Sequence, residues 1–310
     1  MKNPEQIESV QGKLAFRRLD PTLYLLLLSI RSYKKAQIST SEAGYDFART
    51  GAEWSIGWAG SKSETGELSI RFLKAQVQLM ATLQVQILDL NSKYNELEWI
   101  IISDSIAFPL LDILSSYRGN EVSNAAHHSA RLQAIETAAK ALSAFVSILD
   151  TPLLSKKTYD YIVVCTSSIP NGVATDGSFE RGIDCEKALL QLIRTLLANS
   201  TMNGPMNVEL TMILNESQLV GQIAASCIAA ITVDDHERHK DIALQNEALL
   251  TINALLVSVS LKEMWQKLFP GCFVVSRTLP SLSMPCSDSC LTLFSGIVST
   301  RLFSHEVEEF

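Results

Sequence analysis

The stretch that decides the fold runs from Asn124 to Leu149 and reads NAAHHSARLQAIETAAKALSAFVSIL. Its apolar side chains recur at intervals of three or four residues, which places them on one face of an α-helix. They are Leu132, Ile135, Ala139, Leu142, Phe145 and Leu149. Pro152 follows, and the residue before a proline is disfavoured in helical conformation. We therefore expect a helix over 124–149 that ends before Pro152.

Similar apolar blocks occur along most of the chain. They predict further helices over 68–90, 95–116, 185–197, 216–231 and 240–259. In 68–90 the expected apolar face contains Leu68, Phe72, Ala75, Leu79, Leu83, Ile87 and Leu90. The segment 95–116 is apolar nearly all round, so we expect it to be central and buried, with a kink or break at Phe108-Pro109. The segment 7–38 predicts a helical hairpin that turns near Asp20-Pro21.

Helices joined pairwise by short turns indicate the fold class. A pair of amphipathic helices cannot cover its own apolar face, and stacked pairs of this kind form α-solenoids. We predict an all-α protein, an α-solenoid of HEAT- or armadillo-like helical hairpins, with one helical-repeat domain over 1–310. Sequence identity between the pairs is poor, so the repeat assignment depends on the pattern alone.

The segment 39–66 differs from its surroundings, because it is rich in Ser, Thr, Gly, Glu and Ala and shows no period. We expect a flexible insertion there. It contains Trp54 and Trp58. Exposed tryptophans in a flexible loop are candidate partner-binding residues, because aromatic side chains dominate many interfaces. The alternative, that both fold back on the first helices, stays open.

Composition and net charge indicate which classes of binding partner to expect. Hydrophobic residues make up 47% and charged residues 19% of the chain, and the formal net charge is −7. Such a chain is too apolar for disorder and too often interrupted by polar residues for an integral membrane protein. Its negative charge gives no general attraction to nucleic acid or to an anionic membrane surface. We therefore expect protein partners, with no direct binding of nucleic acid or membrane.

The run 23–28, LYLLLL, follows Lys13, Arg17 and Arg18 and so imitates part of a signal peptide. Asp20 and Pro21 interrupt that layout, no small-residue cleavage site follows, and the run is far shorter than the roughly 20 residues of a spanning helix. We expect a buried first helix instead. Single cysteines within apolar stretches fit a reducing compartment, the cytoplasm or nucleus.

Patterns that resemble catalytic or metal-binding motifs are incomplete in this sequence. The stretch 236–239, HERH, has two histidines three apart, whereas the zincin helix needs them four apart. His127-His128 opens a helix with divergent rings, so a cap or surface position is expected. Cys286 and Cys290 lack a second ligand pair. Walker, dinucleotide-binding and nucleophile-elbow patterns do not occur. We expect no catalytic, cofactor or metal site and no enzymatic activity; an all-α enzyme would require a convergent polar pocket.

Three short motifs point to a family. They are FRRLDP at 16–21, IAFPL at 106–110, and Trp265 followed by LFPG at 268–271. In this order they make the chain resemble the N-terminal region of the Tel-two-interacting protein one family, a HEAT-repeat subunit of the Triple-T complex. In the last motif we expect Trp265, Phe269, Pro270 and Gly271 to shape a turn between repeats, and the alternative is that they bind a partner directly. The chain departs from the family at the tryptophan-containing insertion and in the family's later repeats, which have no counterpart before Phe310.

The resemblance implies a protein-binding adaptor. Members of the family act with two other helical-repeat subunits and the HSP-ninety chaperone system in the maturation and stability of phosphatidylinositol-kinase-related protein kinases. The alternative is another HEAT or armadillo scaffold, for example in transport or chromosome maintenance. An extended concave surface with neighbour-only contacts suits either role.

Overall fold

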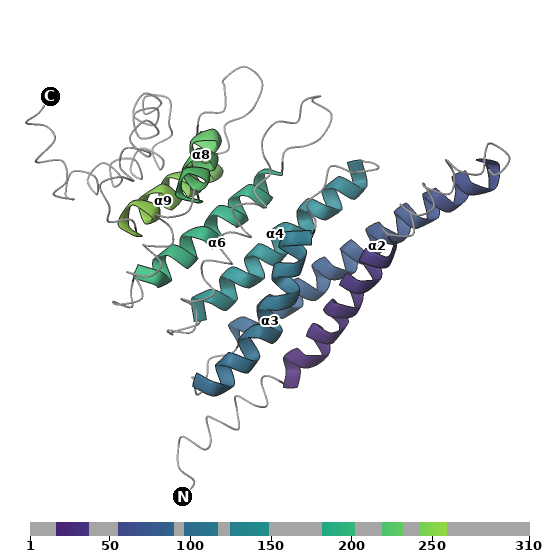
Figure 1. Ribbon diagram of the computed structural model, residues 1–310, viewed down its shortest axis with the longest axis horizontal. Coiled ribbons are helices and arrows are strands. Elements are labelled where there is room, and N and C mark those ends of the chain that lie inside the picture. Colours follow the sequence, from purple (N-terminus) through teal and green to yellow (C-terminus); the bar gives the residue numbers. More distant parts are fainter. Residues whose placement is uncertain are drawn as a thin grey trace, which may run out of the picture. The chain divides into compact units, whose positions relative to one another are not determined.

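The computed structural model describes residues 17–36, 55–89, 96–116, 125–148, 182–201, 219–231 and 242–258. Across these ranges the secondary structure is helical and no strand is present (Figure 1). The prediction of an all-α protein is therefore confirmed for the described part of the chain. Its helices are residues 17–36, here called helix 17–36, followed by α2 (Ser55–Leu88), α3 (Glu96–Ser116), α4 (Ala125–Ile148), α6 (Ile183–Thr201), α8 (Leu219–Ile231) and α9 (Ile242–Ser258).

The chain divides into two compact units. Unit 1 comprises Met1–Phe145 with Ser178–Glu180, and unit 2 comprises Val146–Gly177 with Arg181–Phe310. Helix 17–36, α2, α3 and most of α4 belong to unit 1, whereas α6, α8 and α9 belong to unit 2. A division of this kind is also expected for a long stack of hairpins in which each contacts only its neighbours. The single repeat domain over 1–310 thus stays a prediction.

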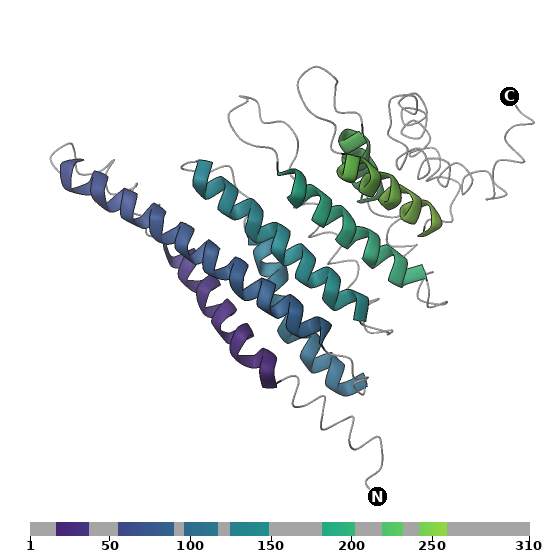
Figure 2. The same ribbon diagram turned by 180° about the vertical axis from the view of Figure 1, so that it is seen from behind.

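Polar contacts between helices fix the directions of the elements in unit 1. Gln86, near the end of α2, donates from Nε2 to the carbonyl oxygen of Arg18, near the start of helix 17–36 (3.4 Å). These two helices are therefore antiparallel. Lys34 pairs with Asp112 near the end of α3, so helix 17–36 and α3 run parallel. Tyr33 contacts His127 near the start of α4, so α4 runs the other way, as can be followed in Figure 2.

The helix α2 begins earlier than expected. It covers 34 residues from Ser55, so the part 55–66 of the segment in which we expected an irregular insertion is helical. Residues 39–54 lie outside the described ranges. The buried stripe of α2 contains Ser69, Leu73, Gln76, Met80, Leu83 and Ile87, whereas Leu68 is exposed. In the first half of α2 the buried stripe is thus displaced by one residue from the expected face. Apolar residues occur on both faces there, and the observed stripe includes the polar Gln76, so the apolar pattern alone did not identify the buried side.

Two prolines lie inside helices instead of ending them. Helix 17–36 continues through Asp20 and Pro21, so the turn that we expected there is absent. Pro109 lies within the unbroken α3. A proline removes one backbone donor, to the carbonyl four residues before it. Burial along the rest of each helix offsets that loss, because each fully buried Leu or Ile contributes about 1.5–3 kcal/mol, and α3 alone buries Ile106, Leu110, Ile113 and Leu114.

In unit 2 the helix α9 packs against both α6 and α8. Glu247 of α9 contacts Arg194 of α6, and one turn later Thr251 contacts Leu190, one turn earlier in α6. Helices α6 and α9 are therefore antiparallel. Leu189, Leu192, Ile193 and Leu196 are among the buried side chains of α6, and Leu244, Ala248, Leu249, Ile252 and Leu255 among those of α9. Asp184 and Glu186 lie in the first turn of α6, where their negative charges interact favourably with the positive end of the helix dipole.

Within the ranges described above, each helix is too short or too polar to cross a lipid bilayer.

Candidate interaction surface

An ion pair in unit 1 joins helix 17–36 to α3. The ammonium group of Lys34 donates to both carboxylate oxygens of Asp112, each at 2.8 Å. Both side chains are partly exposed to solvent, so the pair contributes little free energy, typically about 0–1 kcal/mol. The pair places the exposed edge of α3 beside helix 17–36.

A buried pair of aromatic rings joins helix 17–36 to α4. The rings of Tyr33 and His127 are stacked, with centroids 6.2 Å apart and an interplanar angle of 15°. Tyr33 Oη lies 3.4 Å from His127 Nε2. Burial lowers the pKa of His127, and the nearby charges of Arg131 and His128 lower it further. With 1% of Tyr33 and 4% of His127 exposed, no substrate reaches this pair. We infer that its role is structural.

The expected surface position of the two histidines was therefore wrong for His127. Adjacent helical residues point about 100° apart. His127 accordingly faces the interior, while His128 is only partly buried. The apolar stripe of 124–149 did not include His127, since a histidine in the first turn of a helix also suits a surface position. Its burial depends on Tyr33, which lies 94 residues away in the chain.

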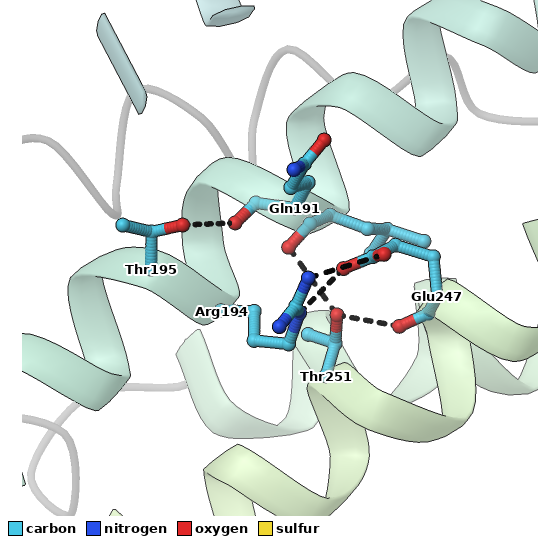
Figure 3. Close-up of polar contacts among 6 residues, drawn as sticks. Gln191, Arg194, Thr195, Glu247 and Thr251 are labelled. Carbon is cyan, nitrogen blue, oxygen red and sulfur yellow. Dashed lines mark hydrogen bonds and ion pairs between the residues drawn. The ribbon is translucent and has the colours of Figure 1, made fainter. Parts of the chain in front are cut away.

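The corresponding contact in unit 2 is the cluster of Arg194, Glu247 and Thr251 (Figure 3). Arg194 donates from Nε to Glu247 Oε1 at 2.6 Å and from a terminal nitrogen to Oε2 at 3.3 Å. Thr251 Oγ1 lies 2.8 Å from the carbonyl oxygen of Glu247 and 3.2 Å from that of Leu190. This two-point pairing of guanidinium and carboxylate fixes the relative orientation of α6 and α9.

Two cysteines in unit 2, Cys185 and Cys227, are reduced and buried, as expected for small apolar side chains. Burial raises the pKa of the Cys227 thiol well above its ordinary value, and the Glu247 carboxylate raises it further. The nucleophilic form of cysteine is the thiolate. Cys227 therefore stays protonated and unreactive in the folded protein. Among the described residues no group of three or more His, Cys, Asp or Glu side chains is arranged to hold a metal ion.

The feature that does suggest binding is the solvent-facing side of helix 17–36, which we call the outer face. Tyr24, Leu25, Leu27 and Leu28 are 66%, 48%, 40% and 49% exposed. The opposite side, with Leu19, Leu23, Leu26, Ile30 and Tyr33, is buried. A single exposed leucine needs no explanation, but a contiguous group of large apolar side chains marks an interaction site.

The expectation of a buried first helix is thus correct for one side only. The sequence contained the signal that we missed. Six consecutive apolar residues, Leu23 to Leu28, cover all directions around a helix at 100° per residue. A helix that packs on one side of a small unit must then expose part of such a run.

The structure does not test the candidate residues taken from the sequence. Trp54, Trp265, Phe269, Pro270 and Gly271 lie outside the described residues. Trp58 lies in the first turns of α2, in a part whose side chains are not described. Their proposed roles in partner binding and in an inter-repeat turn stay predictions.

Comparison with known proteins identifies no relative. No protein-family model matches the chain, and no curated protein or solved structure matches it either.

Proposed function

We propose that this chain is a protein-binding scaffold built from stacked helical hairpins, and that it acts by binding without making or breaking bonds. The single observation that carries the proposal is the outer face of helix 17–36. Its large apolar side chains are exposed, whereas the opposite side of the same helix is buried. Exposed patches of this kind are typical of protein interfaces.

The helix directions in unit 1 support the hairpin stack. Helix 17–36 is antiparallel to α2 and parallel to α3, and α4 again runs in the opposite direction. This alternation is what two consecutive hairpins of a HEAT- or armadillo-like solenoid would show. The antiparallel pair α6 and α9 in unit 2 fits the same principle.

The polar clusters support binding over catalysis. Tyr33 and His127 are buried, Glu247 is largely buried and Arg194 is partly exposed, and each of them joins two helices. Groups that are engaged in this way hold the fold together, whereas a catalytic group must face a substrate. We accordingly place the function on the surface.

The resemblance to the Triple-T subunit refines the proposal to a chaperone-linked adaptor in the cytoplasm or nucleus. Its partners would be other Triple-T subunits, phosphatidylinositol-kinase-related kinases and the HSP-ninety system. The test is affinity purification of the tagged chain from its native cells, followed by mass spectrometry. Recovery of these proteins is the expected result. A reproducible set of unrelated proteins would retain the scaffold and discard the chaperone role, and no enrichment over the tag alone would contradict both.

A further inference from the structure

The outer face carries a charge pattern that narrows the chemistry of its partner. Exposed Arg17 and Arg18 stand at one end of the exposed apolar side chains, and exposed Arg31 and Lys35 stand at the other. The segment 17–36 holds five basic residues and one acidic residue, in a chain whose formal net charge is −7. Among the described residues no acidic side chain forms an ion pair with Arg17, Arg18 or Arg31. These guanidinium groups are therefore available to a partner.

The basic and apolar groups form one line along the helix. At 100° per residue, Arg17, Tyr24, Leu28, Arg31 and Lys35 all lie within about 60° of one another around the axis. Leu25 and Leu27 flank this line on its two sides. Arg17 and Arg31 are fourteen residues apart, which corresponds to about 21 Å along the axis. Four helical turns thus present to the solvent a basic end with Arg17 and the exposed Asp20, an apolar middle, and a basic end with Arg31 and Lys35.

The neighbouring helix α3 widens this surface. Its exposed residues Ser105, Phe108 and Ser115 and the partly exposed Asp112 recur at three- and four-residue intervals, so they form one stripe. Asp112 is bound by Lys34, which places that stripe beside helix 17–36. Phe108 is 65% exposed and lies one turn before Asp112 in α3. Arg31 lies one turn before Lys34 in helix 17–36. Because the two helices run parallel and Lys34 pairs with Asp112, Phe108 is at about the same height as Arg31. An aromatic side chain therefore borders the outer face.

We propose that the outer face binds an amphipathic helical segment of a partner protein whose apolar stripe is flanked at both ends by acidic residues. The partner stripe covers Tyr24 and Leu28, and its acidic side chains pair with Arg17 and Arg31. Helix-on-helix recognition of this kind uses anchors at i, i+3, i+4 and i+7. Complementary charge at the rim speeds association and selects the register. This inference rests on the proposed binding function and specifies the partner's chemistry.

The charge pattern argues against a second copy of the chain as the occupant. In a parallel pair Arg17 would face Arg17, and in an antiparallel pair it would face Arg31 or Lys35. Both arrangements place like charges together, which opposes association.

The same pattern argues against a lipid surface. Interfacial helices carry basic residues on the polar face, beside the inserted apolar one. Here the basic residues stand in line with Tyr24 and Leu28, so inserting those two would carry Arg17, Arg31 and Lys35 toward the hydrocarbon.

The experiment uses the full chain and a fluorescent helical peptide of fifteen residues. The peptide carries Glu at positions 1 and 15 and Leu at positions 5, 8 and 12, which all lie on one face. Fluorescence anisotropy measures the Kd for the unaltered chain and for the variants Tyr24→Ala with Leu28→Ala, and Arg17→Glu with Arg31→Glu. We expect each double variant to weaken binding at least about tenfold, since central apolar anchors and paired rim charges both contribute.

A charge-swapped peptide and an exposed control make the result specific. The peptide with Lys at positions 1 and 15 should bind Arg17→Glu with Arg31→Glu better than it binds the unaltered chain. Gln191→Glu, an exposed change on α6, should leave both affinities unchanged. Circular dichroism verifies that each variant is folded. No binding of the acidic peptide, equal binding by all variants, or binding only to phosphatidylserine vesicles would overturn the proposal.

Purification from native cells separates this inference from the proposed function. If the Arg17→Glu with Arg31→Glu variant recovers the same partners as the unaltered chain, the outer face is not their docking site and the scaffold function stands. If the unaltered chain itself recovers none, the proposed function fails.

Discussion

The imidazole of His127 is in an unusual position for a titratable group, because it is stacked on Tyr33 inside unit 1. Burial, Arg131 and His128 lower its pKa below the ordinary value of 6.5. The unfolded chain then takes up a proton at a higher pH than the folded protein does. The contribution of His127 to stability is complete above about pH 6.5 and is lost as the pH falls from there toward the lowered pKa.

We therefore predict that the free energy of unfolding decreases with acidification in this range, by up to about 1.4 kcal/mol per pH unit for one proton. His127→Gln removes the titration, so its unfolding free energy should vary less with pH. Urea denaturation followed by circular dichroism at several pH values measures this. His128, whose pKa is lowered by burial and by Arg131, adds an effect of the same sign. An unchanged slope in His127→Gln would contradict the assignment.

In unit 2 the Arg194–Glu247 pair illustrates a different residue-scale effect. The Glu247 side chain is 13% exposed. Truncation of its partner therefore leaves a largely buried carboxylate without its main counter-charge.

We predict that Arg194→Ala lowers the free energy of unfolding by about 1–3 kcal/mol. The double variant Arg194→Leu with Glu247→Leu should be closer to the unaltered protein, because both charges are removed together. Chemical denaturation of the two variants gives the comparison. If the double variant is the less stable one, the ion pair contributes more than its desolvation costs, and the expectation is wrong.

At the scale of the element, α3 exposes Phe108 and buries Leu110 two residues later. A helix that is apolar nearly all round does not reveal its buried side by periodicity. The sequence predicted its bounds within one residue and indicated a central, buried helix. Its orientation depends on packing in unit 1, which no local pattern contains.

Two substitutions in α3, one at a buried and one at an exposed position, test the orientation of this helix. Leu110→Ala should cost about 2–5 kcal/mol of unfolding free energy, since it removes a fully buried side chain and leaves a cavity. Phe108→Ala should cost no more than about 0.5–1 kcal/mol, because most of that ring is already in water. Thermal and urea denaturation of both variants test this. Equal losses would show that α3 is rotated about its axis.

Other elements show which sequence signals were sufficient. The helix predicted over 124–149 occurs as Ala125–Ile148, and that predicted over 240–259 as Ile242–Ser258. Both combine a long apolar period with clear end signals. The start of α2 was missed because 55–66 has the Gly and Ser content of a loop, and the outer face was missed because the run Leu23–Leu28 was assigned to one buried side. Burial is a tertiary property, so the local pattern could not show which part of the run Leu23–Leu28 is exposed.

At the scale of the whole molecule, the division into two compact units bears on how stability is distributed. In a stack of hairpins each element contacts only its neighbours, so destabilisation spreads over short distances. In a single cooperative globule it reaches every element.

We predict that Leu110→Ala increases amide hydrogen exchange in helix 17–36, α3 and α4 while α6 and α9 keep their protection. Arg194→Ala should act in the reverse way, with increased exchange in α6 and α9. Hydrogen exchange followed by mass spectrometry resolves these segments. Uniform acceleration in both units for either variant would contradict a neighbour-only architecture.

The buried thiol of Cys227 can report how often unit 2 opens locally. Because the raised pKa and full burial protect this sulfur atom, an alkylating reagent can modify it only when α8 moves away from its surroundings. The rate at which the modified peptide accumulates therefore counts these rare excursions. If a bound partner lowered the rate of Cys227 alkylation, its binding would reduce the local opening of unit 2. The native cysteine would report this without an engineered probe.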